Sequence, residues 1–302
     1  MTEPELAGVL IIDKAKGPTS HDIVASLRRI LHMRKIGHCG TLDPLATGVL
    51  VVCLGRYTRL NRWLSGADKS YEAKIELGAT SPTGDAQGQI TPLEGADPPD
   101  LATVERALER FVGVQQQQPP VYSAIKIDGV PSYKRARRGE EVKLRPRQIT
   151  IHAIERIQYD YPELTLRVNC SSGTYIRSLA MDLGSALGTG AYLADLRRIS
   201  VGRLDLAKAL TLEEVATCQE EGRIREVFAH PRLALDDLES VDLEEEELRD
   251  FTFGKAVPTQ PGGGEVADVC AVFGAGDTLF GIARRERGAL HPFCVLRQHQ
   301  AG

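Results

Sequence analysis

The chain has 302 residues, 42% of them apolar, with six cysteines and a formal net charge of −4. This length and apolar content suit a globular protein of one large domain, or of a large and a small one. No run approaches the ~20 apolar residues of a membrane helix, and residues 1–5 are acidic where a signal peptide is basic, so we expect a soluble, cytoplasmic protein without a membrane span.

The first predicted elements are a strand and a helix. Branched apolar residues at 8–13 predict a strand, which a turn at 14–18 ends. Thr19 and Asp22 have the spacing of a capping box, and apolar residues at helical spacing follow it. We therefore expect an amphipathic helix over 20–32 with a basic polar side.

A glycine-rich segment with a single carboxylate comes next. Residues 37–48 read Gly-His-Cys-Gly-Thr-Leu-Asp-Pro-Leu-Ala-Thr-Gly, and the Asp-Pro pair at Asp43 is typical of a turn. The apolar run at 49–54 predicts a buried strand, and 71–77 alternates with period two. In that second strand Tyr71 shares the inward face with the apolar residues.

The middle of the chain predicts one helix and one irregular, basic segment. Asp100 has the position of a helix cap, and Gly113 can end that helix. Residues 115–120 read as a polar break, and 121–147 mix tyrosines with many basic residues. We expect a mobile, positively charged excursion there.

Alternation then returns and a helix follows. Residues 149–151 and 164–170 alternate as strands, and Ser-Ser-Gly at 171–173 predicts a turn. Apolar residues recur at helical spacing over 176–187, which places Arg177 in the first turn of a helix.

From about residue 239 the pattern changes to an acidic helix, a glycine-rich break at 261–264, and short strands around 266–273 and 279–283. This predicts a small β-rich C-terminal domain over 239–302 after a first domain over 1–238. Because helices and paired strands do not alternate regularly, the predicted fold class is α+β, with a mixed, largely antiparallel sheet flanked by helices.

The charges are segregated along the chain. The acidic residues concentrate at 236–247, whereas basic clusters occupy 28–29, 34–35, 56–62, 134–138, 143–147 and 197–203. Such segregation favours a basic face for a polyanion, although any one cluster is also typical of a solvated helix surface.

The cysteines predict neither disulfides nor a metal site. They are far apart and form no Cys-x-x-Cys pair, so we expect reduced thiols. Cys270, His291 and Cys294 fall short of the four ligands that a structural zinc site needs. Two buried cysteines and a surface histidine are the simpler interpretation.

Three residues remain that could make a site without a cofactor. The sequence lacks a phosphate-binding P-loop, a dinucleotide fingerprint, a zinc-protease motif and a nucleophile elbow. Asp43 could serve as a nucleophile if a nearby arginine such as Arg177 kept it ionised, and Tyr71 could stack on a planar base. Spacing alone favours the plainer interpretation of these residues as a turn aspartate, a core tyrosine and a surface arginine.

Residues 37–50 resemble the catalytic motif of TruB-type tRNA pseudouridine synthases, the stand-alone bacterial enzymes that act on uridine 55 of the T loop. Four further stretches resemble family motifs in the same order: 8–14, Lys69-Ser70-Tyr71, 121–126 and 170–177. The resemblance spans about residues 8–203, and the C-terminal part resembles the family's PUA domain more loosely.

The resemblance implies isomerisation of uridine to pseudouridine in tRNA, with the T arm as binding partner, no cofactor or metal, no protein partner and a monomeric state. The glycosidic bond to C1′ breaks, the uracil rotates, and C5 bonds to C1′. Whether Asp43 attacks C1′, attacks the base or removes a ribose proton first stays open. The implied catalytic residues are Asp43, its partner Arg177 and the stacking Tyr71; the implied substrate-binding residues are Lys14, His38, Tyr71, Tyr175 and Leu196.

Two departures from the family pattern leave other interpretations open. Ala15 stands where proline is usual, and Cys39 lies inside the catalytic loop. Cys39 would suit a uracil methyltransferase, but no methyl-donor loop accompanies it, so a packing role is expected. An RNA chaperone using the same surface, and the guide-RNA-dependent branch of the family, are the remaining rivals.

Overall fold

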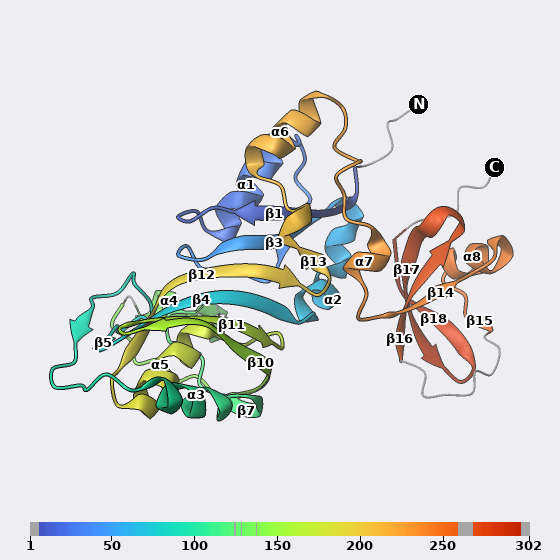
Figure 1. Ribbon diagram of the computed structural model, residues 1–302. Coiled ribbons are helices and arrows are strands. Elements are labelled where there is room, and N and C mark those ends of the chain that lie inside the picture. The colour runs from blue at the N-terminus through green and yellow to red at the C-terminus, as the bar shows by residue number, and fades with distance from the viewer. Residues whose placement is uncertain (1–5, 124, 128, 137, 259–267, 297–302) are drawn as a thin grey trace.

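Two sheets organise the part of the chain described by the computed structural model, which comprises residues 6–123, 125–127, 129–136, 138–258 and 268–296. A nine-stranded sheet occupies the first part, and a five-stranded sheet forms a smaller body at one end (Figure 1). The predicted α+β class is confirmed.

The large sheet is mixed but mostly antiparallel. Its strands follow the order β1-β3-β12-β4-β11-β10-β7, with β2 and β13 at its margin beside β3 and β12. Of these neighbours only β12 and β3 run parallel. The bounds are β1 Gly8–Lys14, β2 Ile36–Cys39, β3 Thr47–Leu54, β4 Lys69–Leu77, β7 Gly113–Gln117, β10 Arg147–Asp160, β11 Glu163–Cys170, β12 Ala191–Val201 and β13 Leu204–Asp205.

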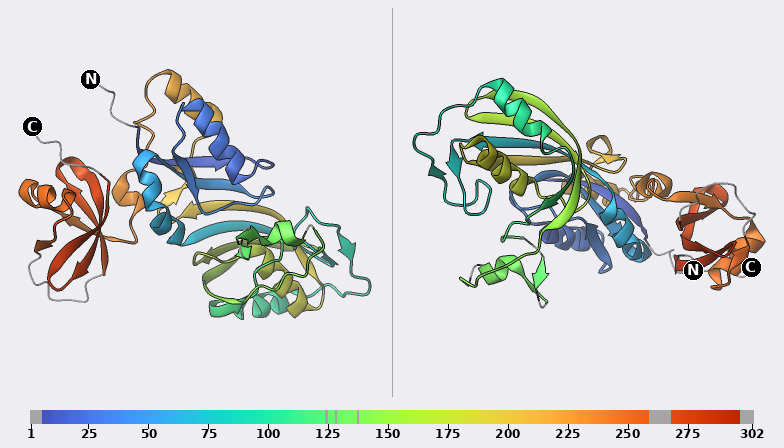
Figure 2. Two further views of the ribbon diagram at one scale, coloured as in Figure 1. Left: turned by 180° about the vertical axis from the view of Figure 1, so that it is seen from behind. Right: turned by 90° about the horizontal axis from the view of Figure 1, so that it is seen from below.

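Helices cover one face of this sheet along its length. The helices α1 and α6 pack together over β1 and β3, and α3 and α5 pack together, with α3 beside β10 and α5 beside β12 and β4 (Figures 1 and 2). On the other face of β1 and β3, apolar side chains of α2, η1 and α7 belong to one cluster that continues into the C-terminal sheet. The helical bounds are α1 Ser20–Ile30, η1 Gly55–Leu60, α2 Asn61–Gly66, α3 Leu101–Glu109, α5 Ile176–Leu187, η2 Leu206–Lys208, α6 Leu212–Glu220 and α7 Pro231–Ala234.

The alternating burial of side chains explains these layers. Leu10 and Ile12 of β1 face the helices, whereas Val9 and Ile11 face the C-terminal side. Because β1 and β3 are covered on both faces, both are continuous apolar runs. In β4, which has one solvated face, burial alternates residue by residue and Tyr71 points inward as predicted.

The predicted helix caps are present. Thr19 and Asp22 form the capping box of α1, with the Asp22 N–H 3.1 Å from the Thr19 hydroxyl. Asp100 accepts a hydrogen bond from the Thr103 N–H at the start of α3. Each cap satisfies backbone N–H groups that have no partner within the helix.

The polar break expected at 115–120 is wrong in its first part. Residues 113–117 form β7, which pairs antiparallel with β10. Because β7 lies at the sheet edge, it needs few apolar residues, and Val114 is 67% exposed. Its glutamines therefore do not show the apolar pattern by which a strand is predicted. The 121–147 segment contains the hairpin β8 Lys126–Ile127 and β9 Val130–Pro131, and α4 Ser132–Ala136, which project from the sheet (Figure 2). A second small pair, β5 Ala79–Thr80 and β6 Thr91–Pro92, lies beyond β4.

The five-stranded sheet has the order β14-β16-β17-β18-β15. Its elements are β14 Glu239–Asp242, α8 Glu245–Thr252, β15 Val257–Pro258, β16 Val269–Gly274, η3 Ala275–Asp277, β17 Thr278–Glu286 and β18 Ala289–Val295. Phe273 and Ile282 join the apolar cluster below β1 and β3, and Arg56 donates to the Leu296 carbonyl at 3.0 Å. The predicted glycine-rich break at 261–264 lies outside the described residues.

Candidate active site

A cavity of about 250 Å³ opens where the loop between β2 and β3 meets β4, β12 and the start of α5. Five of the seven predicted site residues line it: Asp43, Tyr71, Tyr175, Arg177 and Leu196. They come from four separate parts of the sequence, so only the tertiary fold brings them together.

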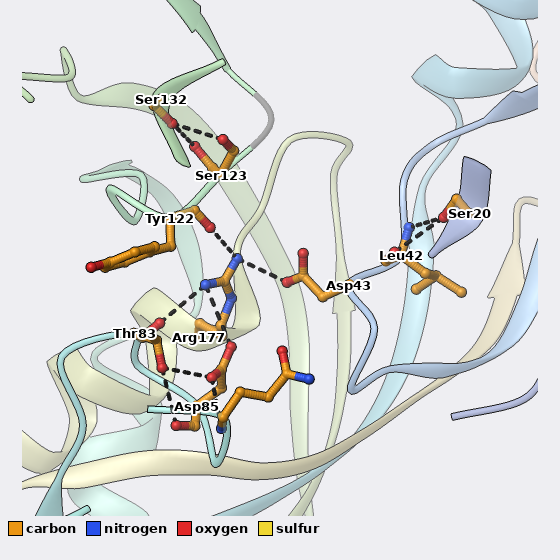
Figure 3. A network of polar contacts seen from close by, with 10 residues as sticks. Ser20, Leu42, Asp43, Thr83, Asp85, Tyr122, Ser123, Ser132 and Arg177 are labelled. Carbon is orange, nitrogen blue, oxygen red and sulfur yellow. Dashed lines mark hydrogen bonds and ion pairs between the residues drawn. The ribbon is translucent and has the colours of Figure 1, made fainter. Parts of the chain in front are cut away.

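The loop over 40–46 presents Asp43 in a tight turn. The Asp43 carbonyl accepts a hydrogen bond from the Ala46 N–H at 3.0 Å, as the Asp-Pro pattern predicted. The Ser20 hydroxyl, at the start of α1, accepts from the Leu42 N–H at 2.8 Å and donates to the Leu42 carbonyl at 3.1 Å (Figure 3). The turn and the helix start therefore fix the carboxylate between them.

Arg177 is buried and holds the carboxylate directly. Its side chain is 5% exposed, which excludes the surface-arginine interpretation, and its Nη2 lies 2.8 Å from an Asp43 oxygen. Its Nη1 lies 3.5 Å from Asp85, and the guanidinium also donates to the carbonyls of Thr83 and Tyr122 at 3.0 and 2.8 Å (Figure 3). These partners fix its plane as well as its position.

A buried glutamine orients the start of α5. Tyr175 occupies the N-cap without a side-chain cap, and its N–H donates to the Gln117 side-chain oxygen at 2.8 Å. The Gln117 amide donates in return to the Tyr175 carbonyl at 3.0 Å. The edge strand β7 thus determines where Tyr175 and Arg177 lie.

The surroundings of Asp43 act on its charge in opposite directions. Its side chain is 41% exposed and lines the cavity. Burial raises the pKa of Asp43 above its ordinary value, and the Arg177 guanidinium opposes that rise. The expectation that arginine would lower this pKa holds for its sign, but burial has the larger effect.

Tyr71 forms the opposite wall with Arg198. The two residues are cross-strand neighbours on β4 and β12, and both line the cavity. Burial raises the pKa of Tyr71, so the phenol stays neutral and its ring can stack on a planar ligand.

Two buried lysines flank the site. Lys69 lines the cavity and donates to the Ser65 carbonyl at 2.7 Å, whereas Lys14 lies behind Asp43 and donates to the Ala46 carbonyl at 2.6 Å. Burial lowers the pKa of each amine to about 8. Lys14 therefore braces the turn that carries Asp43.

Lys14 and His38 are the two predicted residues that do not line the cavity. His38 lies on β2, and its Nδ1 is buried without a hydrogen-bond partner among the described residues. Burial, with Arg198 nearby, lowers the pKa of His38, which favours the neutral imidazole. A contact of either residue with substrate stays a prediction.

Three site residues were missed from sequence. Arg198 reads there as one charge of the basic cluster 197–203, and Asp85 lies in a loop without apolar pattern. Lys69 carried a usable signal, because it stands two residues before Tyr71 and so shares the inward face of β4.

The described residues contain no group of three or more His, Cys, Asp or Glu side chains that could hold a metal ion. Cys270 and Cys294 are buried and His291 is exposed. Cys39 is fully buried, with its Sγ 3.4 Å from that of Cys53, which fits the packing role expected for it. No helix in this part of the chain is long and apolar enough to cross a membrane.

Comparison with known proteins identifies similar chains over nearly the whole length. A family model described as the N-terminal domain of TruB family pseudouridylate synthases matches residues 28–176, and one described as the C-terminal domain of tRNA pseudouridylate synthase B matches 177–248. A tRNA pseudouridine synthase B of Cupriavidus metallidurans is 43% identical, over 95% of this chain and 93% of the relative. Another from Opitutus terrae is 46% identical, over 70% of this chain and 88% of the relative.

Solved structures show the same architecture. A Cbf5-Nop10-Gar1 complex contains a chain with a TM-score of 0.76 and 27% identity, over 96% of this chain and 85% of that chain. An H/ACA RNP bound to a substrate RNA containing 2′-deoxyuridine matches with a TM-score of 0.73 and 26% identity, over the same shares of the two chains.

Proposed function

The chain belongs to the TruB family of pseudouridylate synthases, which isomerise uridine in tRNA, and we propose that its target is uridine 55 of the T loop, with Asp43 as the catalytic nucleophile. The observation that carries this proposal is the ion pair between Asp43 and the buried Arg177, 2.8 Å apart, in the cavity that Tyr71 also lines. A carboxylate held ionised opposite an aromatic platform suits attack on a flipped-out nucleoside.

The reaction is an isomerisation, so its atoms and electrons balance without a cofactor or co-substrate. The bond between N1 and C1′ breaks, the uracil turns, and C5 forms a new bond to C1′. The hydrogen on C5 leaves to water as a proton, and N1 gains a proton. Asp43 supplies a transient covalent partner for the substrate, so that one difficult step becomes two easier ones.

The residues that line the cavity suit a uridine taken out of its stack. Extrusion costs a few kcal/mol, which stacking on Tyr71 and contacts with Leu196 and Tyr175 offset. Arg147 lies 5.5 Å from the Tyr175 ring centre, so a cation stands at the cavity margin where a phosphate would pass. The basic hairpin within 121–147 would then grip the T arm, which is read largely by shape.

We infer that the protein acts alone, as a cytoplasmic monomer, rather than with a guide RNA. The relatives named tRNA pseudouridine synthase B share 43% and 46% identity with it, against 27% for the chain of the Cbf5 complex. We assign catalysis to residues 1–238 and a PUA-like RNA-binding role to 239–302.

Tritium release tests this function. A tRNA transcript carrying 5-tritiated uridine should lose label from one position with the wild-type protein and none with Asp43→Asn. A transcript with cytidine at position 55 should lose no label, whereas a T-arm hairpin alone should still react. Release that persists with cytidine at 55 would contradict the T-loop assignment.

The same experiment separates enzyme from chaperone. If the wild-type protein binds the transcript without releasing tritium, then it is an RNA-binding protein without this chemistry. Asp195→Asn is a matched control, because this aspartate pairs with Lys16 at 3.2 Å and its side chain is 50% exposed.

A further inference from the structure

Arg198 is a fully buried charged residue at the centre of the site, and the reaction as described above gives it no role. Its side chain ranks with the largest fully buried ones, and the residue is 1% exposed. Among the residues that the structure describes, no carboxylate lies within ion-pair distance of Arg198. Burying an arginine without a counter-charge is costly, so its hydrogen bonds must compensate.

Those hydrogen bonds tie both ends of the catalytic loop to one group. The Arg198 Nε donates to the Val49 carbonyl at 2.6 Å, and its Nη2 donates to the Gly40 carbonyl at 3.1 Å. Gly40 precedes Asp43 and Val49 follows it, so the guanidinium closes the loop from behind.

The same guanidinium stands beside the stacking tyrosine. Arg198 lies directly across from Tyr71 in the β12–β4 register, and both residues line the cavity. One planar group with fixed donors therefore lies next to both the loop that carries Asp43 and the Tyr71 ring.

The backbone around Arg198 leaves little room for another arrangement. Gly48 has a φ of +95°, and a Cβ there would lie 2.2 Å from the Arg198 carbonyl oxygen. At Gly40 a Cβ would lie 3.5 Å from the Arg198 Nη1. Strands β3 and β12 thus approach closely beside the guanidinium.

We propose that Arg198 also donates to the Tyr71 hydroxyl and is a positioning residue: it sets the distance between Asp43 and Tyr71, and so aligns the ribose of a stacked uridine with the carboxylate. This inference rests on the proposed function. A misplacement of about 1 Å can cost about 100-fold in rate, so the bridge has a measurable effect.

The test compares two adjacent arginines. Arg198→Lys keeps the charge but cannot reach three acceptors at once, and we expect the single-turnover rate of tritium release to fall by about 100-fold. The dissociation constant for tRNA should change by less than about threefold, because the residue is 1% exposed and contributes little to the surface outside the cavity. Arg197→Lys is the control: this neighbour faces away, pairs with Asp13 at 2.7 Å, is 39% exposed, and should keep the wild-type rate within about twofold.

A double-mutant cycle with Tyr71→Phe separates positioning from a general effect on folding. Removal of the hydroxyl alone should lower the rate by about tenfold. In that background Arg198→Lys should cost only about tenfold instead of about 100-fold, because the bridge is already broken. Additive losses would overturn the proposal, and so would an Arg198→Lys protein that reacts at the wild-type rate.

If Arg198→Lys does not unfold cooperatively, Tyr71→Phe alone decides the matter. A Tyr71→Phe protein with an unchanged melting temperature and an unchanged rate would overturn the bridge. Failure of the proposed function is distinguishable, since the wild-type protein itself would then release no tritium.

Discussion

The two walls of the cavity hold their charges in different ways. On the wall of loop 40–46 and α5, the two carboxylates Asp43 and Asp85 share the single guanidinium of Arg177. On the wall of β4 and β12, the cations Lys69 and Arg198 are held by backbone carbonyls. The first wall can keep an ionised nucleophile, and the second adds positive charge beside the stacking ring. The site thus separates nucleophile from substrate platform, so that a substitution can disturb one wall at a time.

Removal of the shared guanidinium should have the largest effect. Arg177→Met leaves two carboxylates without their cation, which raises the pKa of Asp43 further and misplaces it. If the lost charge and alignment of Asp43 raise the activation free energy by about 4 kcal/mol, the rate of tritium release should fall by about a thousandfold.

Arg156→Met is the matched control for Arg177→Met, because its pair with Glu105 at 3.2 Å is partly exposed and should matter little. An Arg177→Met protein that retains a tenth of the wild-type rate would show that the ion pair is not needed for catalysis.

Lys14, behind the same wall, should affect how stability depends on pH. Its pKa is about 8 in the folded protein against an ordinary 10.5, so the unfolded chain keeps the proton to higher pH. The unfolding free energy should therefore rise between these pH values, by at most about 3 kcal/mol from this group.

Denaturant titrations of wild type and Lys14→Met along a pH series measure that contribution. The stability advantage of wild type over Lys14→Met should grow as the pH rises from 8 toward 10.5. A constant difference would mean that Lys14 titrates normally. Lys74→Met, at an exposed pair with Glu163, serves as the control.

Loss of the aromatic ring should weaken the other wall by a smaller amount. Base stacking contributes about 1–3 kcal/mol, and Tyr71→Leu removes the hydroxyl as well as the ring, so its kcat/KM should lie roughly 5-fold to 150-fold below that of Tyr71→Phe. Tyr71→Phe keeps the ring and should retain more activity than Tyr71→Leu. Equal losses in the two variants would assign the effect to the hydroxyl and its bond to Arg198.

The smallest expected effect is the change of the wild-type rate with each pH unit. Asp43 must be ionised to attack, and its pKa is raised above the ordinary value, chiefly by burial. Activity is therefore present above that raised pKa and should fall by up to about tenfold per pH unit below it. Single-turnover rates measure this, and a rate independent of pH through the acidic range would exclude the carboxylate as the nucleophile.

The local sequence pattern was sufficient to predict a residue's position wherever its neighbours in the sequence decide its environment. The Asp-Pro pair predicted the turn at Asp43, period-two alternation placed Tyr71 inward, and the helical stripe placed Arg177 in a first turn. The capping box of α1 was readable for the same reason, since its two partners stand three residues apart.

Long-range pairing decided the rest. Arg197 and Arg198 are consecutive basic residues, yet one is 39% exposed at its side chain and the other is fully buried. Two register shifts interrupt the pairing of β12 with β4, between Leu193 and Asp195 and between Arg198 and Ser200, so no alternation in the sequence reveals which face each residue takes. Because one step of register exchanges the two faces of a strand, only the assembled sheet determines which arginine enters the site.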